Sequence, residues 1–216
     1  PADEVAVALL RGAFEYQGQK CSAASRAYIP RSLWPAVRER LVTDLASVKM
    51  GDVEDYQNFM GAVIDEGAFT SISGYIDYAK SSDDAEIISG GGYDRSKGWF
   101  IEPTVVLTTD PHFKLMEEEI FGPVITVQSF GDEDEAIAWS NGVEFGLASS
   151  VWTKDVSRAI RVSNALDFGC VWINTHIPLV AEMPHGGFKS SGHGKDLSMY
   201  GLEDYTRIKH VMAYTG

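Results

Sequence analysis

The sequence predicts an α/β fold, in which helices cover both faces of a mostly parallel twisted sheet and an extended tail follows at the C-terminus. Strands and helices of ordinary length alternate regularly from residue 124 onward, which is typical of βαβ units. The first half shows clear helical periodicity, and its glycines fall at turns rather than in a linker. A chain of 216 residues with 44% hydrophobic side chains is also long enough to bury a sizeable core.

The first elements are expected from the spacing of apolar residues. Residues 3–16 are predicted to form a helix with Val5, Leu9 and Ala13 on one face. After a turn, residues 26–29 have the composition of a short strand. The chain is therefore expected to enter the sheet early.

The strongest helical pattern covers residues 32–48. Ser32 can cap the start of this helix, and Pro35 is tolerated in its first turn. Apolar residues recur at every fourth position and predict one buried face: Leu33, Val37, Leu41 and Leu45.

Further elements complete the alternation. A second helix is predicted over 66–80, with Phe69, Ile72 and Ile76 facing inward. In sheets of this kind the reactive groups lie on loops beyond the carboxyl ends of the strands. The remaining elements are expected as strands at 85–89, 100–107, 124–130, 148–153 and 170–174, and as helices at 132–140 and 155–166.

The last residues have a different character. Thr206 to Tyr214 mix polar and apolar residues in an extended pattern, which predicts either an edge strand or a strand added to a neighbour's sheet. We therefore divide the chain into a main domain at 1–203 and an oligomer-forming tail strand at 204–216.

Composition excludes several classes of function. The 31 acidic and 18 basic side chains give a net charge of −13, which argues against nucleic acids and anionic membrane surfaces as partners. Two cysteines are too few for a disulfide framework, so a reducing, cytoplasmic location is predicted. No apolar run reaches the length of a membrane span. Because the chain begins Pro1-Ala2 without methionine, we expect a processed terminus, an engineered start or a piece of a longer protein.

Cys21 is the candidate nucleophile. Its neighbours are small and polar, as expected at an accessible turn just after a helix, and the ammonium of Lys20 could stabilise a thiolate. Taken alone, a cysteine is more often a buried small hydrophobe than a nucleophile, so the residue by itself favours an inert thiol. Cys170 lies in a predicted core strand and is interpreted as structural.

Three segments of the sequence favour a nucleophile over an inert thiol at Cys21. They are Phe14-Glu-Tyr-Gln-Gly-Gln-Lys-Cys-Ser22, then Glu117-Glu-Glu-Ile-Phe-Gly-Pro-Val124, then Pro184-His-Gly-Gly-Phe-Lys-Ser-Ser-Gly-His-Gly-Lys195. In this order and at this spacing, they resemble the catalytic half of the aldehyde dehydrogenase superfamily. The resemblance implies the catalytic-domain fold of that family. It also implies that a cysteine thiolate attacks an aldehyde and that a nicotinamide cofactor removes the hydride.

The same resemblance implies roles for individual residues. Cys21 would be the nucleophile, and its own N–H would be one donor to the oxyanion. Glu119 would hold the nicotinamide ribose of NAD or NADP, between which the sequence does not discriminate, and Phe121 would pack beside it. Ser22 would help bind a substrate carboxylate. The remaining wall of the substrate pocket would come from Thr175, His176, Ile177 and Pro178, and no metal site is implied.

His185 stands where most members of the family have phenylalanine. A histidine near a nucleophilic cysteine suggests a Cys–His protease or thioesterase as an alternative, but no third member of a triad is found at a recognisable spacing. We therefore interpret His185 as a loop residue whose ring bonds to backbone, and His193 as structural. The surrounding glycines are attributed to positive φ and close packing.

The resemblance covers the family's catalytic region and C-terminal tail alone. The dinucleotide-binding half, the glutamate that activates water and the asparagine of the oxyanion site are not found. For this chain alone we therefore expect weak or absent cofactor binding and little turnover. The expected partners are a small aldehyde, and either further copies of the chain or the missing N-terminal half.

The two parts of the chain resemble different members of the family. Residues 1–125 look most like the 1-pyrroline-5-carboxylate (glutamate-semialdehyde) dehydrogenases, and the sequence after 130 looks like the aminobutyraldehyde and betaine-aldehyde dehydrogenases. The resemblance implies either a divergent member or a recombined sequence. The expected substrate is an amino- or carboxy-substituted aliphatic aldehyde. The alternative is a catalytically silent fragment or scaffold with at most a cofactor-independent esterase activity.

Overall fold

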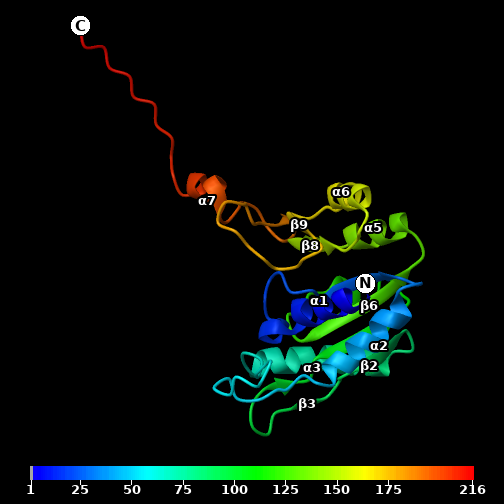
Figure 1. The fold of residues 1–216 in the computed structure, drawn as a ribbon. Helices are drawn as coiled ribbons and strands as arrows, with labels where there is room; N and C mark the ends of the chain where they lie inside the picture. Colours follow the sequence, from blue (N-terminus) through cyan, green and yellow to red (C-terminus); the bar gives the residue numbers. More distant parts are fainter. Residues whose placement is uncertain (1) are drawn as a thin grey trace.

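A four-stranded sheet forms the centre of the molecule. The computed structural model describes residues 2–216, so Pro1 lies outside it. The strand order is β1-β6-β5-β2, with bounds Arg26–Pro30, Val124–Phe130, Thr104–Thr108 and Ala85–Ser89. β1 and β5 both run parallel to β6, whereas β2 is antiparallel to β5. The prediction of a mostly parallel sheet is confirmed, and Figure 1 shows its arrangement.

Helices cover both faces of this sheet. α1 (Ala2–Phe14) and α2 (Trp34–Leu45) pack on one face, and α3 (Glu66–Ser81) packs on the other. Adjacent residues of β5 therefore point to opposite faces of the sheet. Val105 belongs to the core beneath α1 and α2, and Val106 belongs to the core beneath α3. This alternation is what a strand buried on both faces requires.

Strands β8 (Ala148–Val151) and β9 (Cys170–Ile173) form a separate parallel sheet. α5 (Glu133–Asn141) and α6 (Val156–Ala165) accompany it, and Figure 1 shows this part lying above the central sheet. Within residues 2–216, β1 pairs with β6 alone and β8 pairs with β9 alone. The expected strands therefore fall in two sheets rather than one.

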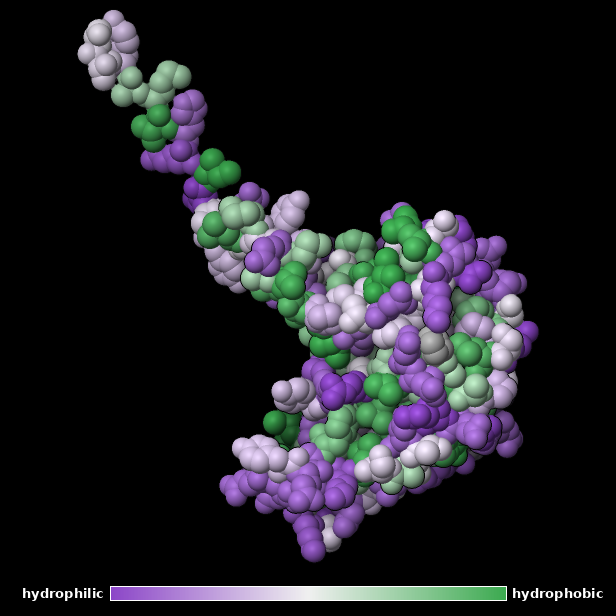
Figure 2. All heavy atoms as spheres, in the orientation of Figure 1, coloured by the Kyte–Doolittle hydropathy of each residue, from purple (hydrophilic) through white to green (hydrophobic). Residues whose placement is uncertain are grey.

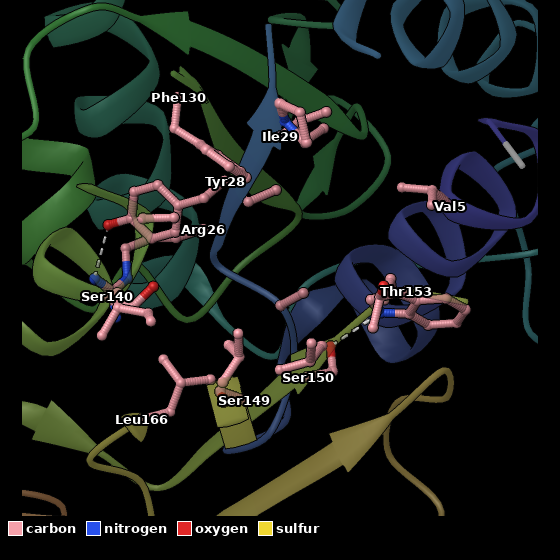
Figure 3. Close-up of a pocket in the computed structure, with 18 of the residues that line it drawn as sticks. Val5, Arg26, Tyr28, Ile29, Phe130, Ser140, Ser149, Ser150, Thr153 and Leu166 are labelled. Carbon is pink, nitrogen blue, oxygen red and sulfur yellow. Dashed lines mark hydrogen bonds between the residues drawn. The ribbon is translucent and has the colours of Figure 1, made fainter. Parts of the chain in front are cut away.

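A cavity of about 560 Å³ lies between these two sheets. Residues of β1 and β8 line it together, and Figure 3 shows Tyr28, Ile29, Ser149 and Ser150 among its walls. Tyr28 donates its hydroxyl hydrogen to the carbonyl of Trp139, and this bond joins β1 to α5. The unpaired edges of β1 and β8 thus face the same cavity.

Local chemistry sets the ends of the helices. The Asp65 carboxylate accepts from the N–H of Ala68 at 2.8 Å and so caps α3, as Asp132 and Asp155 cap α5 and α6. The predicted cap of α2 at Ser32 is wrong, because the helix begins at Trp34 and its cap position is Leu33, which has no polar side chain.

Short elements connect the larger ones. The extended stretch expected at 100–107 divides into two strands, since Pro103 interrupts the pairing. β3 (Tyr93–Asp94) pairs with β4 (Phe100–Ile101), and β10 (Phe188–Lys189) pairs with β7 (Phe145–Gly146), each in antiparallel fashion. The remaining bounds are η1 Glu15–Gly18, α4 Lys114–Glu117 and α7 Ser198–Asp204.

The C-terminal tail leaves the body of the molecule as an extended segment. Residues 205–216 form no strand and are exposed, including Ile208, Val211 and Tyr214, and Figures 1 and 2 show them projecting beyond α7. The tail is therefore no edge strand of this chain's own sheets. Its addition to a neighbouring chain stays a prediction. Over residues 2–216, no helix combines the length and the apolar character that a membrane span requires.

Replacing Leu41 by alanine is expected to lower the free energy of unfolding by about 2–5 kcal/mol. This side chain lies on the inner face of α2 and is fully buried, so its removal leaves a cavity. Urea denaturation measures the change. Leu202→Ala is the matched control, since this leucine of α7 is 55% exposed and its truncation should change stability by no more than about 0.5 kcal/mol. Equal losses in the two variants would contradict the assignment of the core.

Candidate functional site

The backbone before Cys21 has an unusual conformation. After α1 ends at Phe14, three consecutive residues are left-handed: Tyr16 (φ 54°), Gln17 (φ 58°) and Gly18 (φ 65°). This is why the helix expected over 3–16 stops two residues early. The segment turns sharply and carries the following residues back over the sheet.

At Gly18 this segment contacts the backbone of a turn that is distant in the sequence and contains Gly122. The carbonyl oxygens of Ala13 and Gly122 lie where a β-carbon of Gly18 would be. The positive φ and the close backbone contact both require glycine here. Gly18 therefore fixes the nucleophile segment against the turn that contains Phe121.

Cys21 lies at the tip of a turn and is exposed. The N–H of Ala23 donates to the carbonyl of Lys20 at 3.0 Å, and the N–H of Ala24 donates to the carbonyl of Gly12 at 2.9 Å. The N–H of Cys21 itself has no acceptor in the described part of the chain. An accessible thiol with a free backbone donor beside it is the arrangement that oxyanion stabilisation needs.

The ammonium of Lys20 is already engaged. It forms an ion pair with Glu15 at 3.4 Å and lies 5.2 Å from the centre of the Tyr16 ring. Because the carboxylate partly cancels its field, Lys20 offers the thiol less stabilisation than a free ammonium would.

Cys21, Glu119 and Phe121 share one cavity of about 320 Å³. Ile120, between the two cofactor candidates, is buried in the core and holds the turn in place. Its neighbours consequently face outward, and Phe121 adopts φ 54° with 43% of its surface exposed. Residues about one hundred positions apart in the sequence therefore meet at the thiol.

The three consecutive carboxylates differ in their partners. Glu117 bonds to the ring of His112 at 2.8 Å, and Glu118 accepts the hydroxyl of Tyr75 at 2.6 Å. That hydrogen bond to Glu118 raises the pKa of Tyr75 to about 12. Across residues 2–216, Glu119 has neither a hydrogen-bond nor an ion-pair partner for its side chain. Glu119 is thus the carboxylate that is available to paired hydroxyl groups of a ligand.

Ser22 is buried behind the thiol and has two histidine partners. Its carbonyl accepts from Nε2 of His176 at 2.9 Å, and its hydroxyl lies 3.3 Å from Nε2 of His185. His176 packs so closely on α1 that a β-carbon on Gly12 would lie 2.9 Å from its ring. Burial is the main cause that lowers the pKa of His176, so its ring is neutral and donates from Nε2.

The predicted substrate wall lies away from this cavity. His176 lines the 560 Å³ cavity, together with β1 and β8. The Pro178 carbonyl accepts from the indole of Trp172 at 2.9 Å, and Ile177 adopts φ 80°. In the described chain, none of Thr175, Ile177 and Pro178 lines the cavity of Cys21. The roles of Ser22 and of residues 175–178 in substrate binding stay predictions.

Sequence reasoning missed part of the site. The interpretation that the His185 ring bonds to backbone is wrong, because its partner is the hydroxyl of Ser22. Phe145, Phe168, Ser190 and Ser191 also line the cavity of Cys21 and were not anticipated. The run Phe188-Lys-Ser-Ser191 belongs to a segment that resembles the family, but nothing in the run itself indicates that the serines approach the thiol.

Cys170 lies at the start of β9, so the strand predicted for it is found, but this strand is only partly buried and is not part of the core. The structural role of Cys170 stays a prediction, and partial burial raises the pKa of its thiol. A raised thiol pKa makes a cysteine a poor nucleophile at neutral pH. The two cysteines therefore occupy contrasting environments.

Comparisons with known proteins show what the whole chain is similar to. The model of the aldehyde dehydrogenase family matches residues 2–211. The mitochondrial Δ1-pyrroline-5-carboxylate dehydrogenase of Dictyostelium discoideum is 47% identical over 192 residues, covering 85% of this chain and 34% of that protein. The chloroplastic betaine aldehyde dehydrogenase of Beta vulgaris is 39% identical over 211 residues, covering 97% of this chain and 42% of that protein.

Solved structures agree as well. Betaine aldehyde dehydrogenase of Staphylococcus aureus, in complex with NAD⁺, superposes with a TM-score of 0.90 at 38% identity, covering 94% of this chain and 41% of that chain. The chain thus spans between a third and a half of the length of the relatives it matches.

Replacing Gly18 by alanine is expected to lower the free energy of unfolding by about 1–3 kcal/mol, because the added β-carbon overlaps two carbonyl groups at a left-handed position. Chemical denaturation measures this. In the matched control Gly74→Ala, within α3 and with open space around it, stability should rise by about 0.5–1 kcal/mol. A stabilising effect at Gly18 would show that the contact is not a constraint.

Acidification is expected to destabilise the protein through His176. Because burial lowers the pKa of this imidazole in the folded chain, the unfolded chain binds the proton more readily. The contribution of His176 to the free energy of unfolding is complete when the pH is above the pKa that histidine has in the unfolded chain. It is lost as the pH falls through the lowered pKa of His176 in the folded chain. Urea unfolding between about pH 8 and pH 5 should show a smaller acid loss in His176→Gln than in the wild type. The exposed His193→Gln is the control, and equal acid losses in all three proteins would refute the assignment.

Proposed function

The chain belongs to the aldehyde dehydrogenase family, and on that basis we propose that it is the catalytic half of an NAD(P)-dependent enzyme. The proposed reaction oxidises an amino- or carboxy-substituted aliphatic aldehyde to the acid. The observation that carries this proposal is the cavity shared by Cys21, Glu119 and Phe121.

The first step is addition of the Cys21 thiolate to the aldehyde carbon. A sulfur–carbon bond forms, and the electron pair of the carbonyl moves to its oxygen. We expect the N–H of Cys21, which has no acceptor among residues 2–216, to donate to that oxyanion. The resulting thiohemiacetal holds the substrate hydrogen ready for transfer.

The residues at the cavity fit the nicotinamide end of the cofactor. The free carboxylate of Glu119 would accept hydrogen bonds from ribose hydroxyls, and the exposed ring of Phe121 would pack against the nicotinamide. When bound, this group accepts the hydride. Cys21 is then left as a thioester, and water releases the acid and restores the thiol.

The substrate class follows from two kinds of relative. One is named for 1-pyrroline-5-carboxylate and the other for betaine aldehyde, and both of these compounds carry a charged substituent. We propose that Ser22 contributes a hydroxyl to a substrate carboxylate, and that residues 175–178 form part of the wall of the substrate pocket. Both roles are what the family resemblance implies.

The whole activity depends on more than this chain. Because it spans less than half of its relatives, we propose that the chain alone binds NAD weakly or not at all and works with an N-terminal half or further copies. The alternative is a catalytically silent scaffold with at most esterase activity. The two relatives are named as mitochondrial and chloroplastic, so the cytoplasmic location stays a prediction.

Aldehydes are expected to protect Cys21 from alkylation, because the thiohemiacetal removes the free thiolate. Iodoacetamide labelling is followed by mass spectrometry of the peptide that contains Cys21. Glutamate semialdehyde should protect at about tenfold lower concentration than unsubstituted propanal, since a hydrogen bond to its charged carboxylate adds about that much affinity.

Cys170 supplies the internal control for this experiment. It should label more slowly, since burial raises its thiol pKa, and no aldehyde should protect it. The variant Cys170→Ser should retain the protection of Cys21. Equal protection of both cysteines, or none at Cys21, would leave the scaffold as the better description.

A further inference from the structure

Ser22 joins the nucleophile to a histidine that has no assigned role. The sulfur of Cys21 lies 3.9 Å from the hydroxyl oxygen of Ser22, and that oxygen lies 3.3 Å from Nε2 of His185. Both distances are within hydrogen-bond range, the first because sulfur is large. A continuous path for a proton therefore connects the thiol to an imidazole from the far end of the chain.

The His185 ring is oriented by its surroundings. It stacks on Trp172, with ring centres 6.4 Å apart and an angle of 28° between planes. Its other nitrogen, Nδ1, is buried and has no hydrogen-bond partner in the part of the chain that is described. The hydroxyl of Ser22 is thus the single hydrogen-bond partner that the described residues give this ring.

The backbone at His185 is held independently of its side chain. Its N–H donates to the carbonyl of Asp196 at 2.9 Å, and the N–H of Asp196 donates back at 2.8 Å. This antiparallel bridge fixes the loop whatever side chain stands at this position. The imidazole is therefore not needed to hold the loop in place.

The second histidine at Ser22 cannot serve the same purpose. Nε2 of His176 faces a carbonyl, which only accepts, so that nitrogen carries a hydrogen and its ring is neutral through burial. His176 fixes the backbone of Ser22 and thereby the direction of its hydroxyl. The imidazole that is left to exchange a proton with the thiol is His185.

We propose that His185 is a positioning residue that controls the reactivity of Cys21 through the hydroxyl of Ser22. In the resting chain, the thiol donates to the serine oxygen and the serine hydroxyl donates to Nε2 of His185. Passing one proton along this path leaves a thiolate on Cys21, an unchanged serine and a protonated imidazole. The proton returns when the thiol is restored, so the path is balanced and needs no co-reactant.

This inference rests on the proposed function, since it concerns the same thiol, but thiol reactivity is measured without aldehyde or cofactor. The elements around His185 carry other charged groups, and the two ammonium groups among them are engaged elsewhere. Lys20 pairs with Glu15, and Lys195 directs its ammonium to the Gly187 carbonyl at 3.4 Å. The titratable and charged groups on these elements are Glu15, Lys20, Cys21, His176, Lys195 and Asp196.

The test is the rate of Cys21 alkylation by iodoacetamide as a function of pH, read from the peptide that contains Cys21. In His185→Phe the rate at pH 7 is expected to fall about a hundredfold, at the low end of what a proton acceptor contributes, and the profile should move to higher pH. Ser22→Ala should do the same, and combining the two substitutions should add nothing further. His185→Gln keeps a hydrogen-bonding side chain but takes up no proton, so it should match His185→Phe.

Two controls separate this proposal from a structural role. His193→Gln, at an exposed position in the same loop region, should keep the wild-type profile, and the alkylation of Cys170 should be the same in every variant. A wild-type profile in His185→Gln or His185→Phe would overturn the proposal, as would additive effects of Ser22→Ala and His185→Phe. A failure of aldehydes to protect Cys21, with the pH profiles as expected, would refute the proposed function and leave this inference standing.

Discussion

The close approach of two backbone segments at Gly18 is the constraint on which the candidate site depends. Carbonyl groups of Ala13 and Gly122 occupy the space that a side chain would need. Because no other residue fits there without displacement, the end of α1 and the turn at 119–122 remain in contact. That contact places a thiol, a free carboxylate and an aromatic ring around one cavity.

The core supports this contact from below. Ile72 of α3 is buried directly against Gly122, so the packing of α3 on the sheet also fixes the turn that carries Phe121. On the other side of the thiol, the carbonyl of Ser22 anchors the loop at His176. The nucleophile segment is therefore held between the central sheet and the C-terminal loops.

Sequence reasoning predicted the elements whose signals are local. The helix expected over 66–80 is found at Glu66–Ser81, because its apolar spacing and its aspartate cap agree. The end of the first helix was misplaced, since left-handed residues such as Tyr16 leave no signal in composition. Likewise, the resemblance indicated Glu119, but its lack of partners depends on Tyr75 and His112, which occupy the neighbouring carboxylates. Contacts between distant segments decide such details, and one sequence does not reveal them.

The free edge of β1 faces the cavity that this strand shares with β8 rather than open solvent. Strand edges that solvent reaches promote self-association, so enclosing this edge between two sheets keeps its amides away from a second chain. Pro30 closes the strand with a residue that has no N–H to offer. Any segment that entered the cavity and paired along this edge would therefore form a short ladder at most.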